Sequence, residues 1–351
     1  KKFCHICTIL TCYARYQSSF HNNNDEMSKI NEHSECLINF ISKSILKTCG
    51  MSSFLITGSS GFLGKHLVNS IEKNHKVLGL SNDAQYNKSK NFSHLQLNLK
   101  KKKIEIKPSI STIVHLAAIG DIALCNKNPS LCYDINISGT KKMLDICRKK
   151  DANFIFASSS YVYGHPKKLP ISEKEPLKPN SIYGASKILA ENLCEGYAKI
   201  YGLNITVLRF FSIYGPNSPN HNIIFNIIKQ QLKSSNVTIG NRKPKRDFVY
   251  VDDVINAIKL VSKNQKGFDI LNVGSGKSFS IEYICKKIAK ISKKKQKIVT
   301  DNKKVRKNDI PEIRCSYGRI KKIHDWKPKI SIDCGLAKTY DYYVRMKKSK
   351  K

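Results

Sequence analysis

The sequence has no apolar run that approaches the roughly 20 residues needed to cross a bilayer as a helix. A membrane-spanning protein is therefore not expected. No internal repeat is visible along the chain either. With 351 residues, 40% of them hydrophobic, the chain is long enough for one large domain or two medium domains with a buried core, so disorder throughout is excluded.

Acidic side chains are scarce, since 26 Asp and Glu stand against 62 Lys and Arg and give a formal net charge of +36. A charge of this size, taken alone, suggests a nucleic-acid binder whose lysines replace counterions along phosphates. The lysines are, however, spread along nearly the whole chain among many Asn and Ile, whereas basic arms usually form compact blocks. We therefore expect no specific nucleic-acid partner, although a small anionic substrate would be attracted electrostatically.

A second cysteine pair at zinc-binding spacing is missing. The run Cys4-His5-Ile6-Cys7, with Cys12, could supply part of a zinc site, but nothing completes a tetrahedral set, so no metal is expected. The cysteines beyond residue 50 have irregular spacings and mostly apolar neighbours. They are typical of reduced core residues, which favours a cytoplasmic protein.

Residues 1–50 begin without Met and show no clear periodicity, whereas Met51 directly precedes an apolar run and the first strong motif. We interpret residues 1–50 as a disordered or non-native extension. A targeting peptide is the competing interpretation, but such peptides avoid acidic residues. This segment contains Asp25, Glu26, Glu32 and Glu35.

From residue 53 onward, short apolar runs alternate with longer amphipathic ones. Strands this apolar, separated by helices, predict a parallel sheet covered on both faces, which is a doubly wound α/β fold of the Rossmann type. The expected strands are 53–57, 76–80, 94–97, 112–115 and 154–157, and the expected helices are 62–73, 134–149 and 223–233.

The chain after this sheet is less regular and predicts a smaller α/β subdomain. We expect residues 51–215 to form the dinucleotide-binding domain with the catalytic residues, and residues 216–351 to form mainly a substrate-binding subdomain. Residues 236–275 are expected to return partly to the first domain. The subdomain would cover the carboxyl ends of the strands, where open α/β sheets bind their ligands.

A glycine-rich stretch, TGSSGFLG, joins the first expected strand to the first expected helix. Gly58 permits the tight turn, Gly61 lets the backbone approach a pyrophosphate, and Gly64 lets the helix pack on the strand. The helix N-terminus then faces the anion. The pattern predicts a bound dinucleotide with contacts from Gly58, Ser60, Gly61, Phe62, Leu63 and Gly64.

The end of the second expected strand bears on the choice between NAD and NADP. A carboxylate there accepts from the ribose 2′-hydroxyl of NAD and repels a 2′-phosphate. Asp83 stands about two positions beyond the usual place. No Arg that would bind the 2′-phosphate of NADP stands there. The sequence favours NAD through Asp83 and leaves NADP open.

Tyr183 and Lys187 lie four residues apart in YGASK, a spacing that places them on one face of a helix. A lysine beside a phenol stabilises the phenolate, lowers its pKa and makes the tyrosine usable as a base. Upstream, the apolar run FIFA leads into Ser158-Ser159-Ser160. A hydroxyl at the end of this strand could meet the same substrate oxygen as the tyrosine.

Several stretches taken together, and in this order, carry a resemblance. They are TGSSGFLG at Thr57, IVHLAA at Ile113, NISGTKKML at Asn136, FASSSYVYG at Phe156, YGASK at Tyr183, LRFFSIYGP at Leu208, RDFVYVDD at Arg246 and ILNVGSG at Ile270. From Met51 to about Tyr343 the chain resembles the extended short-chain dehydrogenases/reductases of the NAD-dependent epimerase/dehydratase family, among them the UDP-glucose 4-epimerases.

The resemblance implies roles for individual residues. Ser159 would be the catalytic serine, Tyr183 the base, and Lys187 the residue that holds the nicotinamide ribose. The resemblance implies further cofactor contacts from Leu116, Ala117, Ala118, Ser158 and Phe210. It implies substrate contacts from Ser159, Tyr183, Ser212, Arg246, Arg306 and Asp309. An arginine suits a diphosphate because its planar fork donates two parallel hydrogen bonds.

Three positions depart from the family pattern. Members usually carry Asn in place of Ser212, and an acid in place of both Asn98 and Ser81. The first departure concerns the contact with the sugar, and the other two concern recognition of the adenosine.

The function implied is NAD-dependent 4-epimerisation of a UDP-hexose through a transient 4-keto sugar, in a homodimer. A nucleotide-sugar reductase, decarboxylase or dehydratase would use the same residues. The dehydratase is disfavoured, because Ser160 and Tyr161 stand where an acid would protonate the leaving hydroxyl. A non-catalytic NAD(P)-sensing or nucleic-acid-binding protein is the alternative from another class, although it would be expected to have lost Tyr183 or Lys187.

Overall fold

The computed structural model describes residues 52–83, 89–100, 104–295, 297–302, 305 and 309–349. The expected extension at residues 1–50, with its cysteines, lies outside the described residues. So does Arg306.

Seven parallel strands form the central sheet in the order β10-β6-β5-β4-β1-β2-β3. They are β1 (Ser53–Thr57), β2 (Lys76–Ser81), β3 (Phe92–Gln96), β4 (Thr112–His115), β5 (Asn153–Ser159), β6 (Ile205–Phe210) and β10 (Phe268–Val273). The strand order reverses between β1 and β4, which is where ligands of such sheets bind. The expected doubly wound parallel sheet is confirmed.

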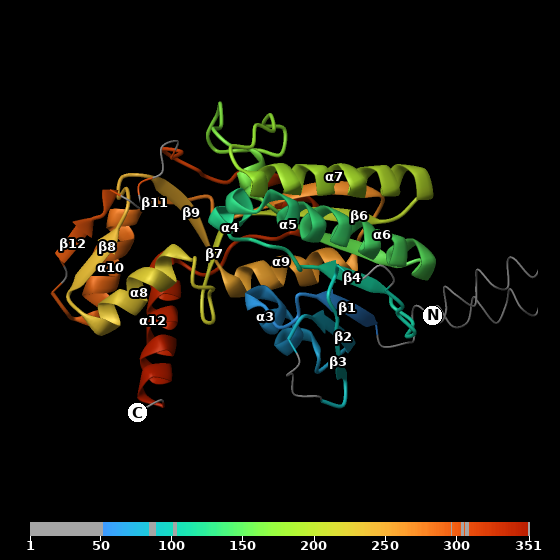
Figure 1. The fold of residues 1–351 in the computed structure, drawn as a ribbon, viewed down its shortest axis with the longest axis horizontal. Helices are drawn as coiled ribbons and strands as arrows, with labels where there is room; N and C mark the ends of the chain where they lie inside the picture. The colour runs from blue at the N-terminus through green and yellow to red at the C-terminus, as the bar shows by residue number, and fades with distance from the viewer. Residues whose placement is uncertain are drawn as a thin grey trace, which may run out of the picture. The chain divides into compact units, whose positions relative to one another are not determined.

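Helices cover both faces of this sheet (Figure 1). One layer contains α5 (Pro129–Tyr133), α6 (Gly139–Lys150) and α7 (Ile182–Tyr201), and the other contains α3 (Phe62–Ile71) and α9 (Val251–Lys263). The short helix α4 (Ile122–Lys127) contacts α5 and α7. Because both faces are covered, the inner strands are buried: all four residues of β4 are buried, as are six of the seven in β5. The edge strand β3 is mostly exposed.

The register of the central strands aligns their carboxyl ends. Thr57 of β1 pairs with His115 of β4, and His115 pairs with Phe156 of β5. The glycine turn after β1, the segment after β4 and the end of β5 therefore emerge at the same edge of the sheet.

The long helix α7 is delimited by local signals. Ser181 caps its N-terminus by accepting from the backbone N–H of Gly184. Gly202 ends it with a φ of +65°, in the left-handed region that favours glycine. These limits place Tyr183 and Lys187 in its first two turns.

The smaller part of the molecule contains two further sheets. Its strands are β7 (Ser212–Tyr214), β8 (Asn236–Ile239), β9 (Lys245–Tyr250), β11 (Ser278–Ser280) and β12 (Lys297–Thr300), and its helices are α8 (Ile223–Lys233), α10 (Ile281–Ser292), α11 (Gly318–His324) and α12 (Ile332–Lys348). The first sheet has the order β11-β9-β7 and the second pairs β12 with β8. One apolar core runs from Leu67 in α3 to Ile284 in α10, so the two parts are packed together.

Several local features differ from the sequence predictions. Strand β3 begins two residues earlier than the expected 94–97, helix α3 ends two residues before the expected 73, and β6 and β10 were not among the expected strands. The expected helix over 134–149 begins as a π-helical turn at Asp134–Ser138 and becomes regular only in α6. The strand expected at 154–157 is longer and extends through Ser159. Within the part of the chain that is described, no helix is both long and apolar enough to cross a membrane.

Candidate active site

The end of β5 and the first turns of α7 bring three predicted residues together. The hydroxyl of Ser159 hydrogen-bonds the phenol of Tyr183. The Nζ of Lys187 donates to the carbonyl oxygen of Ala157 over 2.8 Å. Lys187 Nζ lies 5.9 Å from the centre of the Tyr183 ring. The four-residue spacing thus directs the phenol and the ammonium toward the end of β5.

Burial determines the electrostatics of this pair. It raises the pKa of the Tyr183 phenol to about 12, and the hydrogen bond from Ser159 opposes that effect. Burial also lowers the pKa of Lys187 to about 8, and the charge of Glu191 opposes that effect. Near neutral pH, Lys187 is therefore mostly protonated while Tyr183 keeps its proton. Further positive charge near the phenol would be needed before Tyr183 acts as a base.

The turn between β1 and α3 fits a dinucleotide pyrophosphate. Gly58 has a φ of +68°, which favours glycine. A Cβ on Gly64 would lie 2.1 Å from the carbonyl oxygen of Gly58, so only glycine allows this helix to start so close to the strand. Gly61, at the N-cap of α3, has no side chain to cap the helix. The backbone N–H groups of the first turn are thus available to an anion.

A buried chain of hydrogen bonds supports the segment after β4. The backbone N–H of Ala117 donates to Thr57 Oγ1 over 3.1 Å, and Thr57 Oγ1 lies 2.7 Å from His115 Nδ1. His115 Nε2 lies 3.1 Å from Thr140 Oγ1, which donates to the carbonyl oxygen of Asn136. Burial lowers the pKa of His115 to about 3. The ring is therefore neutral, with Nδ1 accepting from Thr57 and Nε2–H donating to Thr140.

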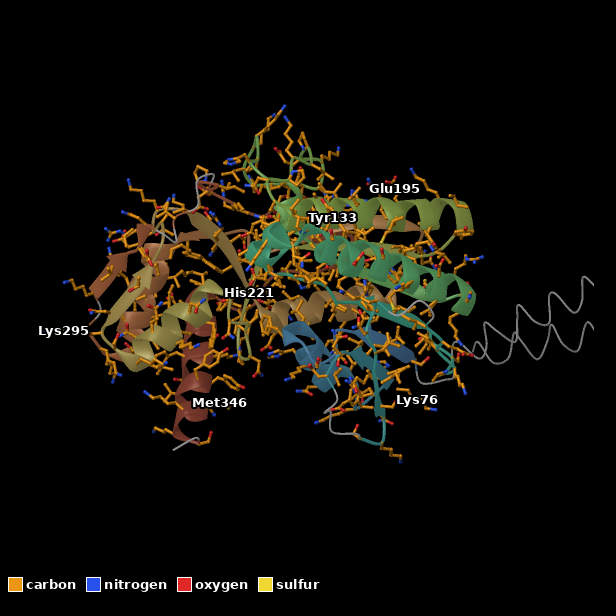
Figure 2. All side chains as sticks on the ribbon, viewed as in Figure 1. Lys76, Tyr133, Glu195, His221, Lys295 and Met346 are labelled. Atoms are coloured by element: carbon orange, nitrogen blue, oxygen red, sulfur yellow. The ribbon has the colours of Figure 1, made fainter. Side chains whose placement is uncertain are left out.

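Two adjoining cavities open beside the predicted catalytic residues. The larger, of about 520 Å³, includes Ser159 and Tyr183 in its lining, together with Ser212 and Arg246. His221, also in its lining, lies where the sheet and the smaller part of the molecule meet (Figure 2). The smaller cavity has about 290 Å³. The two share Ile122, Ala123, Tyr161, Arg246 and Asp309.

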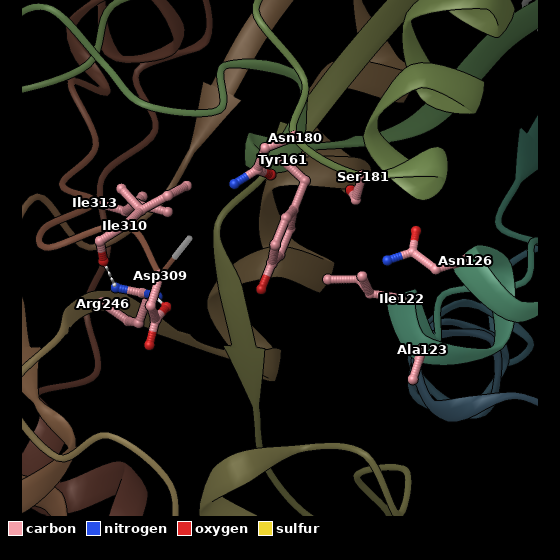
Figure 3. Close-up of a pocket in the computed structure, with 10 residues that line it drawn as sticks. All are labelled: Ile122, Ala123, Asn126, Tyr161, Asn180, Ser181, Arg246, Asp309, Ile310 and Ile313. Atoms are coloured by element: carbon pink, nitrogen blue, oxygen red, sulfur yellow. Dashed lines mark hydrogen bonds and ion pairs between the residues drawn. The ribbon is translucent and has the colours of Figure 1, made fainter. Parts of the chain in front are cut away.

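Tyr161 divides the two cavities. Its ring projects between the Arg246–Asp309 pair and Ile122 (Figure 3). It stands edge to face with the Tyr183 ring, with centroids 6.0 Å apart. The sequence analysis noted Tyr161 only because it stands where a dehydratase would carry an acid. It did not predict that Tyr161 lines a cavity.

Arg246 brings a cation to the cavities from β9. Its Nη2 donates to Asp309 Oδ1 over 2.6 Å, and its Nη1 donates to the carbonyl oxygen of Ile310 over 2.7 Å. The neighbouring Asp247 is buried and accepts from the backbone N–H groups of Ser275, Gly276 and Cys315. Burial raises the pKa of Asp247 to about 6, against the effect of these hydrogen bonds. Asp247 thereby fixes the strand that carries Arg246.

The remaining predicted residues lie in different surroundings. Phe210 is buried at the end of β6. Ser158 is buried, lines neither cavity, and donates its hydroxyl to Glu191. Asp83 is exposed just beyond the end of β2. At the end of that strand, the hydroxyl of Ser81 lies 2.7 Å from His94 Nε2.

The lining also includes residues that sequence reasoning did not single out. Helix α4 contributes Ile122, Ala123 and Asn126. Its start carries a recognisable signal, because Asp121 accepts from the backbone N–H groups of Ala123 and Leu124 as an N-cap.

Comparisons with known proteins show the family of this chain. The family model described as "NAD dependent epimerase/dehydratase family" matches residues 54–274. The UDP-glucuronate 4-epimerase of Thermodesulfobacterium geofontis is 32% identical over 316 residues, which cover 83% of this chain and 96% of that protein.

Solved structures are similar as well. The UDP-glucose 4-epimerase of Thermotoga maritima, solved with UDP-glucose, has a TM-score of 0.76 at 27% identity and covers 84% of this chain and 99% of its own. The UDP-glucuronic acid 4-epimerase of Bacillus cereus, in complex with UDP-glucuronic acid and NAD, has a TM-score of 0.75 at 26% identity, with the same coverage.

Proposed function

The chain belongs to the NAD-dependent epimerase/dehydratase family, and from this premise we propose that it is an NAD-dependent 4-epimerase of a UDP-hexose. The observation that carries the proposal is the buried Tyr183 phenol. It is bonded to Ser159, lies beside Lys187, and lines a cavity that also contains an arginine. Tyr183, Ser159 and this arginine could serve as a base, a hydroxyl donor and a cation for a diphosphate, and they line one cavity.

NAD is the cofactor that we propose. The turn from Gly58 to Gly64 and the start of α3 would hold its pyrophosphate, Asp83 its adenosine ribose, and Tyr183 with Lys187 its nicotinamide ribose. Further contacts are proposed from Leu116, Ala117, Ala118, Ser158 and Phe210. When bound, NAD would supply the acceptor for the hydride of the sugar carbon C4, and its oxidised ring would add positive charge beside the phenol.

The side chains of the protein would then transfer the proton of the sugar 4-hydroxyl. Tyr183, as phenolate, would take the proton of the sugar 4-hydroxyl, while Ser159 donates a hydrogen bond to the same oxygen. The Lys187 ammonium would stabilise the phenolate. After the 4-keto sugar has turned over in the cavity, the hydride would return to the opposite face of C4 and Tyr183 would return the proton to the 4-oxygen, which gives the 4-epimer. Arg246 would hold the diphosphate throughout, with Ser212, Asp309 and Arg306 as further proposed substrate contacts.

Each rival function can be distinguished from the epimerase by one property. A dehydratase needs an acid beside the catalytic serine, and the two residues that follow are Ser160 and the cavity-lining Tyr161. A reductase or decarboxylase uses the same triad and would be recognised by its product. A nucleic-acid-binding protein would not need a phenol and an ammonium buried beside a cavity.

We also propose a homodimer in the cytoplasm. Helix α7 presents apolar side chains to the surface, with Leu189, Ile200 and Tyr201 at 46%, 76% and 48% exposure, and such faces favour pairing. Six of the seven cysteines that the structure describes are free and buried, which suits a reducing compartment. Light scattering should give twice the chain mass in solution. A monomer mass would contradict the dimer.

A panel of nucleotide sugars tests the function. Purified protein with NAD is incubated with UDP, GDP and dTDP sugars, including UDP-glucose, UDP-galactose and UDP-glucuronate, and the products are separated by chromatography and identified by NMR. Interconversion of 4-epimers without net redox supports the proposal. A product of lower mass points to decarboxylation or dehydration. Salt-sensitive DNA binding without turnover would replace the enzyme with the nucleic-acid-binding alternative.

A further inference from the structure

Helix α7 holds the end of β5 at three successive residues. Tyr183 bonds the hydroxyl of Ser159, and Glu191 accepts from the hydroxyl of Ser158. Lys187 donates to the carbonyl oxygen of the residue before Ser158. The three helix residues are four apart, so each turn of the helix contacts one residue of the strand.

Glu191 differs from the other two because a second strand holds it as well. Its carboxylate receives Arg209 Nη2 at 2.6 Å and Arg209 Nε at 3.1 and 3.2 Å. Both side chains are almost completely buried, at 3% and 4% exposure. A lone charge would be too costly at this depth, and each of the two side chains supplies a partner of opposite charge for the other.

Arg209 is itself anchored. Its Nη1 donates to the phenol oxygen of Tyr163 over 3.0 Å, and Tyr163 donates to Asn272 Oδ1 over 2.6 Å. Asn272 lies on β10, next to β6, which carries Arg209. The carboxylate of Glu191 therefore has a fixed position relative to three strands of the sheet.

We propose that Glu191 is a positioning residue for the reaction, which holds the end of β5 in register with α7 so that the Ser159 hydroxyl stays on the Tyr183 phenol. The proposal rests on the proposed function, because it concerns the same triad. Misplacing a catalytic group by about 1 Å can cost roughly a hundredfold in rate. Ser158, whose hydroxyl donates to Glu191, directly precedes Ser159 on β5, so a shift of Glu191 would reach Ser159 through it.

The position of Glu191 also has an electrostatic consequence. It lies one helical turn after Lys187, and its charge is the main influence that opposes the lowering of the Lys187 pKa by burial. The charged and titratable groups that face Lys187 are Tyr183, Glu191 and Cys194 on α7, Cys125 on α4, Cys132 on α5 and His115 on β4, with Arg209 on β6 beyond Glu191. Glu191 is the acid in this set, so its removal would lower the pKa of Lys187 further.

The test compares Glu191→Gln with Glu195→Gln. Glu195 lies one turn further on the outer side of α7 (Figure 2), and its side chain is 42% exposed. Two readouts are measured: kcat and KM with the sugar that the panel selects, and the titration midpoint of Lys187 by NMR of ¹³C-labelled lysine. A Lys187→Met variant assigns the resonance. The NMR titration needs no turnover, so it reports on Glu191 even if the panel shows no epimerisation and the proposed function fails.

In Glu191→Gln, kcat should fall roughly ten- to hundredfold with little change in KM. The Lys187 midpoint should fall by about one pH unit, and the alkaline limb of the rate profile should move with it. Glu195→Gln should match the wild type in both. Glu191→Asp keeps the charge and should retain the midpoint while losing part of kcat. The proposal is overturned if Glu191→Gln keeps the wild-type kcat or the wild-type midpoint.

Loss of an ion-pair partner can prevent folding. If Glu191→Gln does not fold, Ser158→Ala carries the test, because it removes the hydroxyl that joins Glu191 to the strand. Since Ser158 is also a proposed cofactor contact, the affinity for NAD is measured beside kcat and should match that of the wild type. This variant should melt close to the wild type and lose kcat. An unchanged kcat in Ser158→Ala would overturn the proposal.

Discussion

The hydroxyl of Thr57 lies 2.7 Å from Nδ1 of His115 and joins the two central strands between which the strand order reverses. The same hydroxyl accepts from the backbone N–H of Ala117. This contact fixes the segment that we propose as a wall of the cofactor site, and burial keeps the neighbouring imidazole neutral by lowering its pKa.

Acid should therefore weaken the fold through His115. Burial lowers its pKa from 6.5 to about 3. Between pH 6.5 and pH 3, His115 is therefore protonated in the unfolded chain and neutral in the folded chain. The stability from neutral His115 is complete above pH 6.5 and is lost as the pH falls toward 3, at about 1.4 kcal/mol for each pH unit.

Urea unfolding at several pH values between 7 and 4 checks this. His115→Gln should be less stable than the wild type at pH 7, and the difference should shrink as the pH falls. The exposed His165 provides the control, because His165→Gln should follow the wild type. A difference between His115→Gln and wild type that stays constant with pH would show that His115 does not titrate in this way.

Gly64→Ala should weaken both the fold and the binding of NAD. The new Cβ would lie 2.1 Å from the carbonyl oxygen of Gly58 and 2.6 Å from the Cα of Ser59, and overpacking of this kind costs about 1–3 kcal/mol. The turn must shift, and so must the N–H groups that would face the pyrophosphate. Thermal melting and calorimetric titration with NAD measure the two effects.

Gly196→Ala is the matched control for that substitution. Gly196 lies within α7, and a Cβ there would meet nothing within 4 Å. Alanine should stabilise the helix by about 0.5–1 kcal/mol and leave NAD affinity unchanged. Equal NAD affinities for Gly64→Ala and Gly196→Ala would remove the glycine turn from the proposed cofactor site.

Arg246→Met should raise KM more than it lowers kcat. The guanidinium is held by Asp309 and the carbonyl of Ile310 at the cavity wall. A hydrogen bond to a charged group contributes about 1.5–3 kcal/mol, so KM for the UDP sugar should rise roughly ten- to hundredfold. The neighbour Lys245, whose side chain is 54% exposed, gives the control variant Lys245→Met. An unchanged KM in Arg246→Met would exclude Arg246 as a diphosphate ligand.

The inner strands of the central sheet could be predicted because they are short, apolar and buried on both faces, whereas β6 and β10 were not among the expected strands. TIVH and SFLIT coincide with β4 and β1. Helices α4 and α5 could not be predicted, because with six and five residues they are too short for a helical period to show. Their capping residues, Asp121 and Asn128, were the available signals.

The proximity of the proposed catalytic pair could be predicted because its geometry is local to one helix. Tyr183 and Lys187 need only the four-residue spacing of α7 to face the same strand. The partners of the other charges are distant in sequence. Arg209 meets Glu191 across 18 residues, and Arg246 meets Asp309 across 63. Such pairings depend on strand order and on the packing of the smaller part, which one sequence does not specify.

Tyr183 as the base of an epimerisation is tested most directly with the UDP sugar that the panel selects, carrying deuterium at C4, together with NAD. The product of the wild type and of Tyr183→Phe is followed by NMR, with circular dichroism to confirm that the variant is folded. The wild type should form the 4-epimer with the deuterium retained at C4, and Tyr183→Phe should be slower by about 10²- to 10⁴-fold. Turnover by folded Tyr183→Phe at the wild-type rate would contradict the assignment of the base.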